Sequence, residues 1–365
     1  MREKLELRVR EEYAPLLFSK NEGTHLGDSI RKVVLDSSDP RLDQVAEFQK
    51  EYRRLKRRFF SGWIYHREYS ERELASAPCF TLETTAVFEP AGEDCGTLYD
   101  EHDTCAHVFT SGETRLPGRQ PIKWKRSCGA GARQISDLTL DFRKIPKNKD
   151  IARTIAHEWI VSQQLADLLL DSRMTGFELR PVRHKSRFED DPLVLESLGS
   201  GRELLRRAEE HGIARASWEF DVWINQAEQR QLMHNARQES TNMKHEREVR
   251  KPQRFPARYQ LVVTSDPVGV AAPPTQFGTE PFNYDREGVY RCPFGHIAGL
   301  NLLSEVTIKV GDWRDGGDIL RTKEMVGVRE GVLRPHPILL ISPRLYKLLR
   351  RDKVKGFQVE VAHLA

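Results

Sequence analysis

Apolar residues in the first 79 positions follow two different periods. Leu5, Leu7 and Val9 alternate with charged residues, which is typical of a strand with one buried face. Further on, apolar residues recur at steps of three and four, the period of an amphipathic helix. These residues are Leu42, Val45, Phe48, Tyr52, Leu55 and Phe59. Ser70 and Glu73 then form a capping-box pattern, which predicts the start of a second, short helix.

The two halves of the chain end on the same order of apolar and polar positions. Residues 160–162 (Ile-Val-Ser) correspond to 340–342 (Leu-Ile-Ser), and the Gly-Phe pair at 176–177 corresponds to that at 356–357. Each copy predicts a buried strand, a serine cap, an amphipathic helix, a glycine turn and a final strand. The leucines expected on the buried helix faces are Leu165, Leu168 and Leu169 in one copy, and Leu345, Leu348 and Leu349 in the other.

A longer internal repeat contains these endings. Residues 128–140 align without a gap with 296–308, and apolar stretches typical of strands precede them at 80–88 and 259–264. Two copies predict a pseudo-symmetric pair, because a solenoid needs at least three. We therefore predict an α+β fold of two related units, each ordered strand, zinc-knuckle-like turn, strand, helix, strand, with a helical N-terminal extension. The predicted segments are an N-terminal α/β extension (1–79), copy one (80–184), a polar helical connector (185–258) and copy two (259–365).

The connector does not share the repeat pattern. Residues 202–211 predict a helix, and the alternation of aromatic and acidic residues at 218–223 predicts a strand. Residues 226–258 contain eight Lys or Arg against four Asp or Glu and have little apolar periodicity. This tract is expected to be a solvated helix that leads into a loop.

Charge and cysteine content limit the class of protein. The chain has 365 residues, with 58 basic and 54 acidic side chains, and this small excess does not by itself indicate a nucleic-acid-binding protein. The five cysteines are Cys79, Cys95, Cys105, Cys128 and Cys292. An odd, scattered set without an apolar leader or a membrane-spanning run predicts a cytoplasmic protein that does not enter a membrane.

The repeat places a cysteine opposite a histidine, an exchange that a zinc site permits. Cys292 and His296 have the short, turn-forming spacing of a metal knuckle, and Cys105 and Cys128 are their counterparts in the first copy. Together these four residues predict one structural zinc per chain, closed by four ligands and joining the two copies. Cys95, His102 and His107 are alternative ligands. The competing interpretation is that the cysteines are small buried apolar residues and that no metal is retained.

Other patterns are weaker. The basic and aromatic run at 53–60 is compatible with a nucleic-acid patch, but it also fits the solvated face and the core of the helix before it. His157-Glu158 lacks the second histidine of a zincin helix, because Val161 occupies that position. An enzyme site between the copies would need groups such as His102, Asp103, His107 and Glu158 to meet in one pocket.

The knuckle-like cysteines and the ending at residues 340–359 resemble the double-CXXCG proteins of myxobacteria, over about 100 residues per copy. The resemblance departs from the family pattern at the ligands, because neither knuckle is an intact Cys-x-x-Cys-Gly. It implies an immunity-type protein whose partner is a toxin or another co-encoded protein. We therefore expect a non-enzymatic protein-binding protein with a zinc-stapled scaffold. The alternatives are a nucleic-acid-binding zinc-knuckle protein and an enzyme with an unrecognised site between the copies.

Overall fold

The protein divides into two compact units in a computed structural model. The first unit comprises Met1–Arg183 and Ala257–Ala365, and the second comprises His184–Pro256. The structure describes residues 1–55, 57–100, 105, 108–114, 122–185, 255–284, 296–297, 300–313, 317–327 and 332–365. The helix and the strand predicted at 202–211 and 218–223, and nearly all of the polar tract at 226–258, therefore lie outside the described residues.

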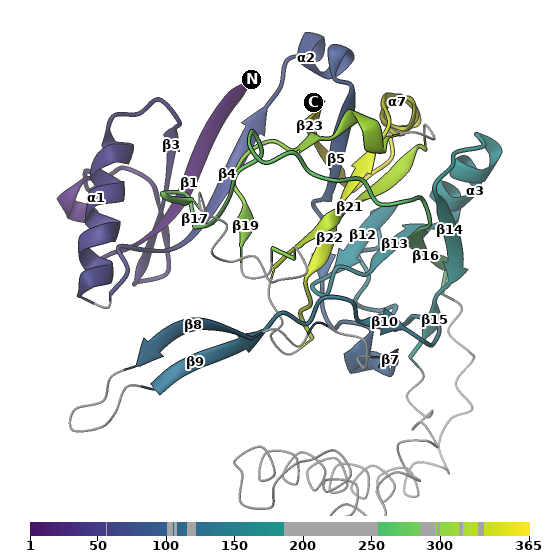
Figure 1. Cartoon of the computed structure of the whole chain (residues 1–365), viewed down its shortest axis with the longest axis horizontal. Coiled ribbons are helices and arrows are strands. Elements are labelled where there is room, and N and C mark those ends of the chain that lie inside the picture. The colour runs from purple at the N-terminus through teal and green to yellow at the C-terminus, as the bar shows by residue number, and fades with distance from the viewer. Residues whose placement is uncertain are drawn as a thin grey trace, which may run out of the picture. The chain divides into compact units, whose positions relative to one another are not determined.

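The N-terminal part of the first unit is a four-stranded antiparallel sheet with one helix beside it (Figure 1). In order, its strands are β2 (Thr24–Leu26), β3 (Ile30–Asp36), β1 (Arg2–Arg10) and β4 (Phe60–Glu68). Leu5, Leu7 and Val9 of β1 are buried in one cluster with Val33 and Leu35 of β3. The strand predicted from their alternation is confirmed.

Helix α1 (Arg41–Arg54) is shorter than the sequence pattern indicates. Its periodic positions were expected to continue to Phe59, but Leu55 is 63% exposed. The helix ends because the Arg57 N–H donates to the Tyr52 carbonyl at 2.8 Å and turns the chain toward β4. Phe59 is fully buried all the same, beyond the helix, with its ring stacked 5.4 Å from that of Phe48.

Two five-stranded sheets form the rest of the core. The first runs, in order, β14 (Phe177–Pro181), β16 (Arg258–Val263), β13 (Trp159–Ser162), β12 (Ile151–Thr154) and β6 (Val87–Phe88). The second runs β20 (Thr307–Ile308), β23 (Phe357–Leu364), β5 (Cys79–Thr84), β22 (His336–Ile341) and β21 (Ile319–Val326). With helices on the same unit, the architecture is α+β.

Four strands of each sheet have the same order and register, with one strand taken from the other half of the chain. In the first sheet β13 pairs with β16 through Ile160 and Gln260, and in the second β22 pairs with β5 through Leu340 and Thr81. Figure 1 shows β5, from the first half, among β21, β22 and β23, whereas β16, from the second half, lies among β12, β13 and β14. Neither half of the chain therefore builds its five-stranded sheet from its own strands alone.

Helices α3 (Gln163–Asp171) and α7 (Pro343–Arg351) follow β13 and β22 directly. The side chains of Ser162 and Ser342 accept hydrogen bonds from the backbone N–H of Leu165 and Leu345, as the N-cap prediction requires. Apolar residues of both helices enter one core cluster, where Leu168 is partly buried and the others are buried: Leu165, Leu169, Leu345, Leu348 and Leu349. The predicted order of strand, cap, helix, glycine and strand is confirmed at both places.

Short elements complete the described chain. The helices are η1 (Ala14–Leu16), α2 (Glu71–Ser76), η2 (Glu93–Cys95) and η3 (Val310–Asp312), and α2 begins with the predicted Ser70–Glu73 capping box. The strands are β7 (Tyr99–Asp100), β8 (Val108–Thr114), β9 (Ile122–Ser127), β10 (Arg133–Gln134), β11 (Thr139–Leu140), β15 (Arg183–His184), β17 (Phe277–Glu280), β18 (Asn283–Tyr284) and β19 (Asn301–Leu302). Among the described helices none is both long and apolar enough to cross a bilayer.

Candidate functional site

Two of the predicted metal ligands are held together by backbone pairing. The Cys105 N–H donates to the Ala130 carbonyl and the Gly129 N–H donates to the Cys105 carbonyl, both at 2.9 Å. Gly129 and Gly131 have φ of 60° and 103°, a left-handed conformation that glycine adopts at little cost. The glycine-rich sequence thus folds the Cys128 turn back against Cys105, and both cysteines are buried.

A histidine from the second half of the chain completes a group of three ligands. The ligand atoms of Cys105, Cys128 and His296 all lie within 4.8 Å of one another. Cys128 Sγ is 3.5 Å from His296 Nδ1. Zn–S and Zn–N bonds of about 2.3 and 2.05 Å would place these atoms about 3.6 Å apart at a tetrahedral angle. The Cys128–His296 distance fits such bonds, and the group of three side chains can hold a metal ion.

The structure brings together three of the four ligands that the sequence predicts. Cys292 lies outside the described residues, as do His102 and His107. Cys95 is buried at the end of η2 and does not belong to the group of three. Two thiolates and an imidazole are donors that suit zinc, and a fourth donor would close the site.

The basic run near α1 does not present its aromatic residues for nucleic-acid binding. Phe59 and Phe60 are buried in the N-terminal core, so they cannot stack on bases. Arg53 forms an ion pair with Glu280 at 2.8 Å, and Gln49 donates to the same carboxylate at 2.7 Å. The burial of Phe59 and Phe60 fits the interpretation that the aromatic residues of this run belong to the core.

Glu158 is one of the residues that an enzyme site between the copies would need. In the structure its carboxylate is fully engaged in hydrogen bonds that hold neighbouring segments together. Its carboxylate is buried and accepts hydrogen bonds from the Gly92 N–H at 2.8 Å, the Thr154 hydroxyl at 2.7 Å and the Tyr99 hydroxyl at 2.5 Å. His102, Asp103 and His107 lie outside the described residues. Through these hydrogen bonds Glu158 links the loop at Gly92, strand β7 at Tyr99 and strand β12 at Thr154.

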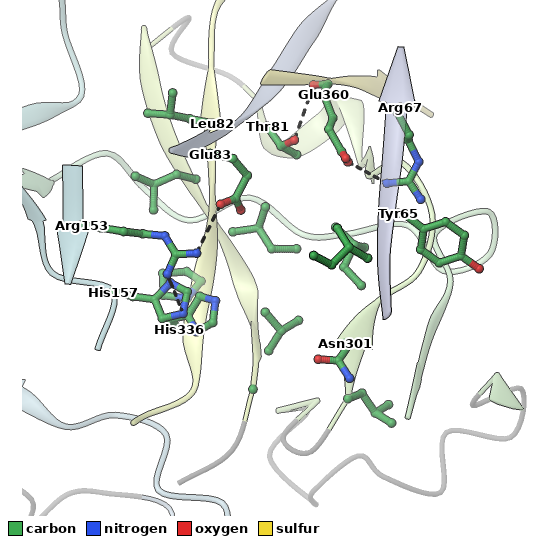
Figure 2. Close-up of a pocket in the computed structure, with 18 of the residues that line it drawn as sticks. Tyr65, Arg67, Thr81, Leu82, Glu83, Arg153, His157, Asn301, His336 and Glu360 are labelled. Carbon is green, nitrogen blue, oxygen red and sulfur yellow. Dashed lines mark hydrogen bonds and ion pairs between the residues drawn. The ribbon is translucent and has the colours of Figure 1, made fainter. Parts of the chain in front are cut away.

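A pocket of about 650 Å³, which the sequence did not indicate, lies between β4 and the second five-stranded sheet (Figure 2). On one wall the rings of His157 and His336 stack with centroids 3.2 Å apart. Arg153 Nη1 is 3.1 Å from His157 Nδ1, and Arg153 Nη2 is 3.6 Å from the Glu83 carboxylate. Burial and the nearby Arg153 lower the pKa of His336 to about 4, and burial, His336 and Arg153 lower the pKa of His157 as well.

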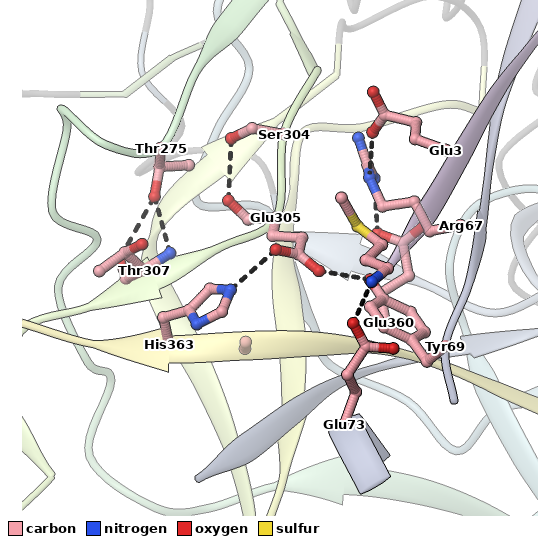
Figure 3. A network of polar contacts seen from close by, with 12 residues as sticks. Glu3, Arg67, Tyr69, Glu73, Thr275, Ser304, Glu305, Thr307, Glu360 and His363 are labelled. Carbon is pink, nitrogen blue, oxygen red and sulfur yellow. Dashed lines mark hydrogen bonds and ion pairs between the residues drawn. The ribbon is translucent and has the colours of Figure 1, made fainter. Parts of the chain in front are cut away.

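The opposite side of this pocket is closed by a polar network around Arg67 (Figure 3). Arg67 Nε donates to Glu3 at 2.7 Å, Nη1 donates to Glu360 at 2.8 Å, and Nη2 donates to the Leu303 carbonyl at 2.9 Å. Burial raises the pKa of Glu360, although the Arg67 guanidinium opposes that shift. The network fixes β4 beside β23 and the end of β19.

Comparisons of this chain with protein-family models, curated proteins and solved structures found no match. Its function must therefore be inferred from its own residues, chiefly from the three-ligand group and the pocket.

Proposed function

We propose that this chain is a non-enzymatic protein-binding protein of the immunity type, with a duplicated scaffold stapled by one structural zinc ion. The observation that carries the proposal is the meeting of Cys105, Cys128 and His296 within 4.8 Å. With Cys292 as the fourth ligand, the site would have a closed Cys3His donor set, which is characteristic of structural zinc. Such a site contributes folding free energy and leaves no open position for a reacting water.

The matching registers of the two sheets support the duplicated scaffold. β12 pairs with β13 through Ala152 and Ile160, and β21 pairs with β22 through Leu320 and Leu340. Two related units that have exchanged their first strands, β5 and β16, account for this arrangement. The proposed zinc ligands also come from both halves of the chain, so the ion would join segments that the exchange of strands already brings together.

The nature of the partner is proposed from the sequence. The ending at 340–359 and the knuckle-like cysteines resemble an immunity-type family, in which the partner is a toxin or another co-encoded protein. We expect binding in the cytoplasm and no catalytic turnover.

The zinc site is tested by measuring metal per chain in protein purified without chelator, together with two variants. We expect about one zinc ion in the wild type and a loss of the ion with a lower Tm in Cys292→Ala. Cys79→Ala is the matched control, because Cys79 is buried in a different cluster and should keep the metal. Well-folded protein without metal would remove the zinc from the proposal.

The binding role is tested separately by co-expressing the chain with the products of its neighbouring genes. A co-encoded protein that co-purifies, or whose toxicity this chain neutralises, would support the proposal. Failure to bind any such neighbour would count against it whatever the metal content.

A further inference from the structure

Helices α3 and α7 are equivalent elements of the two halves of the chain and lie beside each other in the first unit (Figure 1). Arg344, in the first turn of α7, donates from Nη2 to the Ser172 carbonyl just after α3 at 2.6 Å. At the other end, Gln164 in the first turn of α3 and Lys353 just after α7 line one cavity of about 300 Å³. The two helices are therefore antiparallel, and because their leucines are buried in one cluster, their exposed sides share one face of the protein.

The exposed sides of these helices carry opposite charges at equivalent positions. With residue 160 aligned to residue 340, Asp167 corresponds to Lys347 and Asp171 corresponds to Arg351. All four side chains are exposed. Both helices have the same length, a serine cap and buried leucines at the same positions, so the fold itself requires neither set of charges. These charges are therefore available for a contact outside the chain.

The central charges of this face, Asp167 and Lys347, form no ion pair among the described residues. Each is the middle residue of a nine-residue helix. Asp167 accepts a hydrogen bond from the Gln163 amide at 2.7 Å, and Lys347 has no side-chain hydrogen bond within the described part of the chain. Arg344 and Arg351, in contrast, already form ion pairs with aspartates of the same chain. Asp167 and Lys347 are therefore the charges that remain free to contact another molecule.

A face with this pattern is complementary to itself. A twofold rotation about an axis that lies in the face and runs along the helices places α3 of a second copy over α7 of the first, antiparallel to it. The helix midpoints then coincide, so Asp167 of one copy meets Lys347 of the other, and the symmetry forms this contact twice. Leu170, which is 60% exposed, would be covered by the first turn of the opposite α7. The occupant that fits this face is therefore a second copy of the chain.

We infer that this protein forms a twofold-symmetric dimer through the face formed by α3 and α7, with two Asp167–Lys347 ion pairs at its centre. Opposite charges favour this orientation, whereas α3 over α3 or α7 over α7 would bring like charges together. Exposed ion pairs are individually weak and are screened by salt, so the dimer should be reversible and favoured by low ionic strength. This inference goes beyond the proposed function and requires neither the zinc ion nor a toxin partner.

The test measures the mass of the full chain by sedimentation equilibrium, at protein concentrations between about 1 μM and 1 mM and at about 50 mM salt. We expect a monomer–dimer equilibrium in the wild type. Asp167→Lys and Lys347→Asp should each raise the dimer Kd about tenfold or more, because each reversal brings like charges together. An equimolar mixture of the two variants should form a heterodimer, since opposite charges then face each other again. For the same reason the double variant Asp167→Lys/Lys347→Asp should recover the wild-type Kd.

Lys20→Asp and Asp28→Lys are the matched controls, because they change the net charge equally at exposed positions of the N-terminal part and should keep the wild-type Kd. The Tm of each variant is measured first to show that it folds. A wild type that stays monomeric throughout, or a dimer that neither reversal weakens, would overturn the inference, as would a double variant that does not recover. None of these outcomes depends on metal content or on a co-encoded neighbour, so the proposed function is tested separately.

Discussion

Asp150 and Asp318 make the same pair of contacts in opposite directions between the two sheets. Asp150 accepts from the Ser162 hydroxyl at 3.1 Å and from the Lys355 N–H at 2.8 Å. Asp318 accepts from the Ser342 hydroxyl at 2.7 Å and from the backbone N–H of Thr175 at 3.1 Å. Each carboxylate therefore joins the helix cap beside it to the turn that precedes the last strand of the other sheet.

Replacement of Asp318 by Ala is expected to lower the free energy of unfolding by about 3 kcal/mol. The carboxylate is almost fully buried, and its removal leaves the donors of Ser342 and Thr175 without an acceptor. Urea unfolding measures the change. The control is Asp171→Ala at the exposed end of α3, which should change stability by less than about 0.5 kcal/mol. Equal effects at the two positions would contradict the role given to Asp318.

Gly176→Ala and Gly356→Ala are each expected to lower stability by more than about 2 kcal/mol. Their φ values are 90° and 102°, and an added Cβ would lie 2.2 Å from the Ile319 carbonyl oxygen and 2.3 Å from that of Ile151. Gly311→Ala is the control, because a Cβ there meets nothing within 4 Å. Thermal unfolding of the three variants compares the two turns with this open position. An unchanged Tm for Gly176→Ala would show that the turn can move away from Ile319 and would contradict the prediction.

Stability is expected to fall as the pH drops from about 6.5 to 4. His336 has a pKa of about 4 in the folded chain, while an unfolded histidine titrates near 6.5, so the unfolded state binds more protons in this interval. The loss is up to about 1.4 kcal/mol per pH unit for each such histidine, and His157 adds to it. Urea unfolding across this range should give a flatter profile for His157→Asn/His336→Gln.

Chelation is expected to expose Cys105 and Cys128 to alkylation but not Cys79. Burial raises the pKa of the Cys79 thiol to about 12, so almost no reactive thiolate forms at neutral pH. Peptide mass spectrometry after iodoacetamide treatment, with and without chelator, counts the modified residues. Labelling of Cys79 would report global unfolding, and identical labelling of Cys105 and Cys128 in both samples would argue against a bound metal.

The sequence predicts local elements of this fold better than their pairing. The caps at Ser162 and Ser342 and the alternation at Leu5, Leu7 and Val9 depend on neighbours in the chain, so they can be recognised without a structure. The placement of β5 and β16, each in the sheet built mainly from the other half of the chain, cannot be recognised in this way. A strand has the same apolar pattern whichever sheet it joins. Contacts extend the correspondence of the two halves further upstream, because the Thr97 and Thr275 hydroxyls accept equivalent hydrogen bonds from the N–H of Thr139 and Thr307.

The candidate site was predictable to a similar extent. The repeat pointed to Cys105, Cys128 and His296, because ligand residues remain recognisable in an alignment of two copies. The pocket could not be predicted from the sequence, because β4, β5 and β19 lie far apart in the chain and no motif links them. His336 lies at the start of an apolar strand, where sequence alone favours a core position.

The exchanged strands have a consequence for synthesis on the ribosome. The sheet built from β12, β13 and β14 needs β16, which is translated only after the 73 residues of His184–Pro256. Until then the sheet lacks the strand that pairs with both β13 and β14. Strand β5 stays unpaired for longer, because β22 and β23 are translated last. Both sheets therefore close late in translation, and a chain released early would expose the strand edges on which aggregation begins.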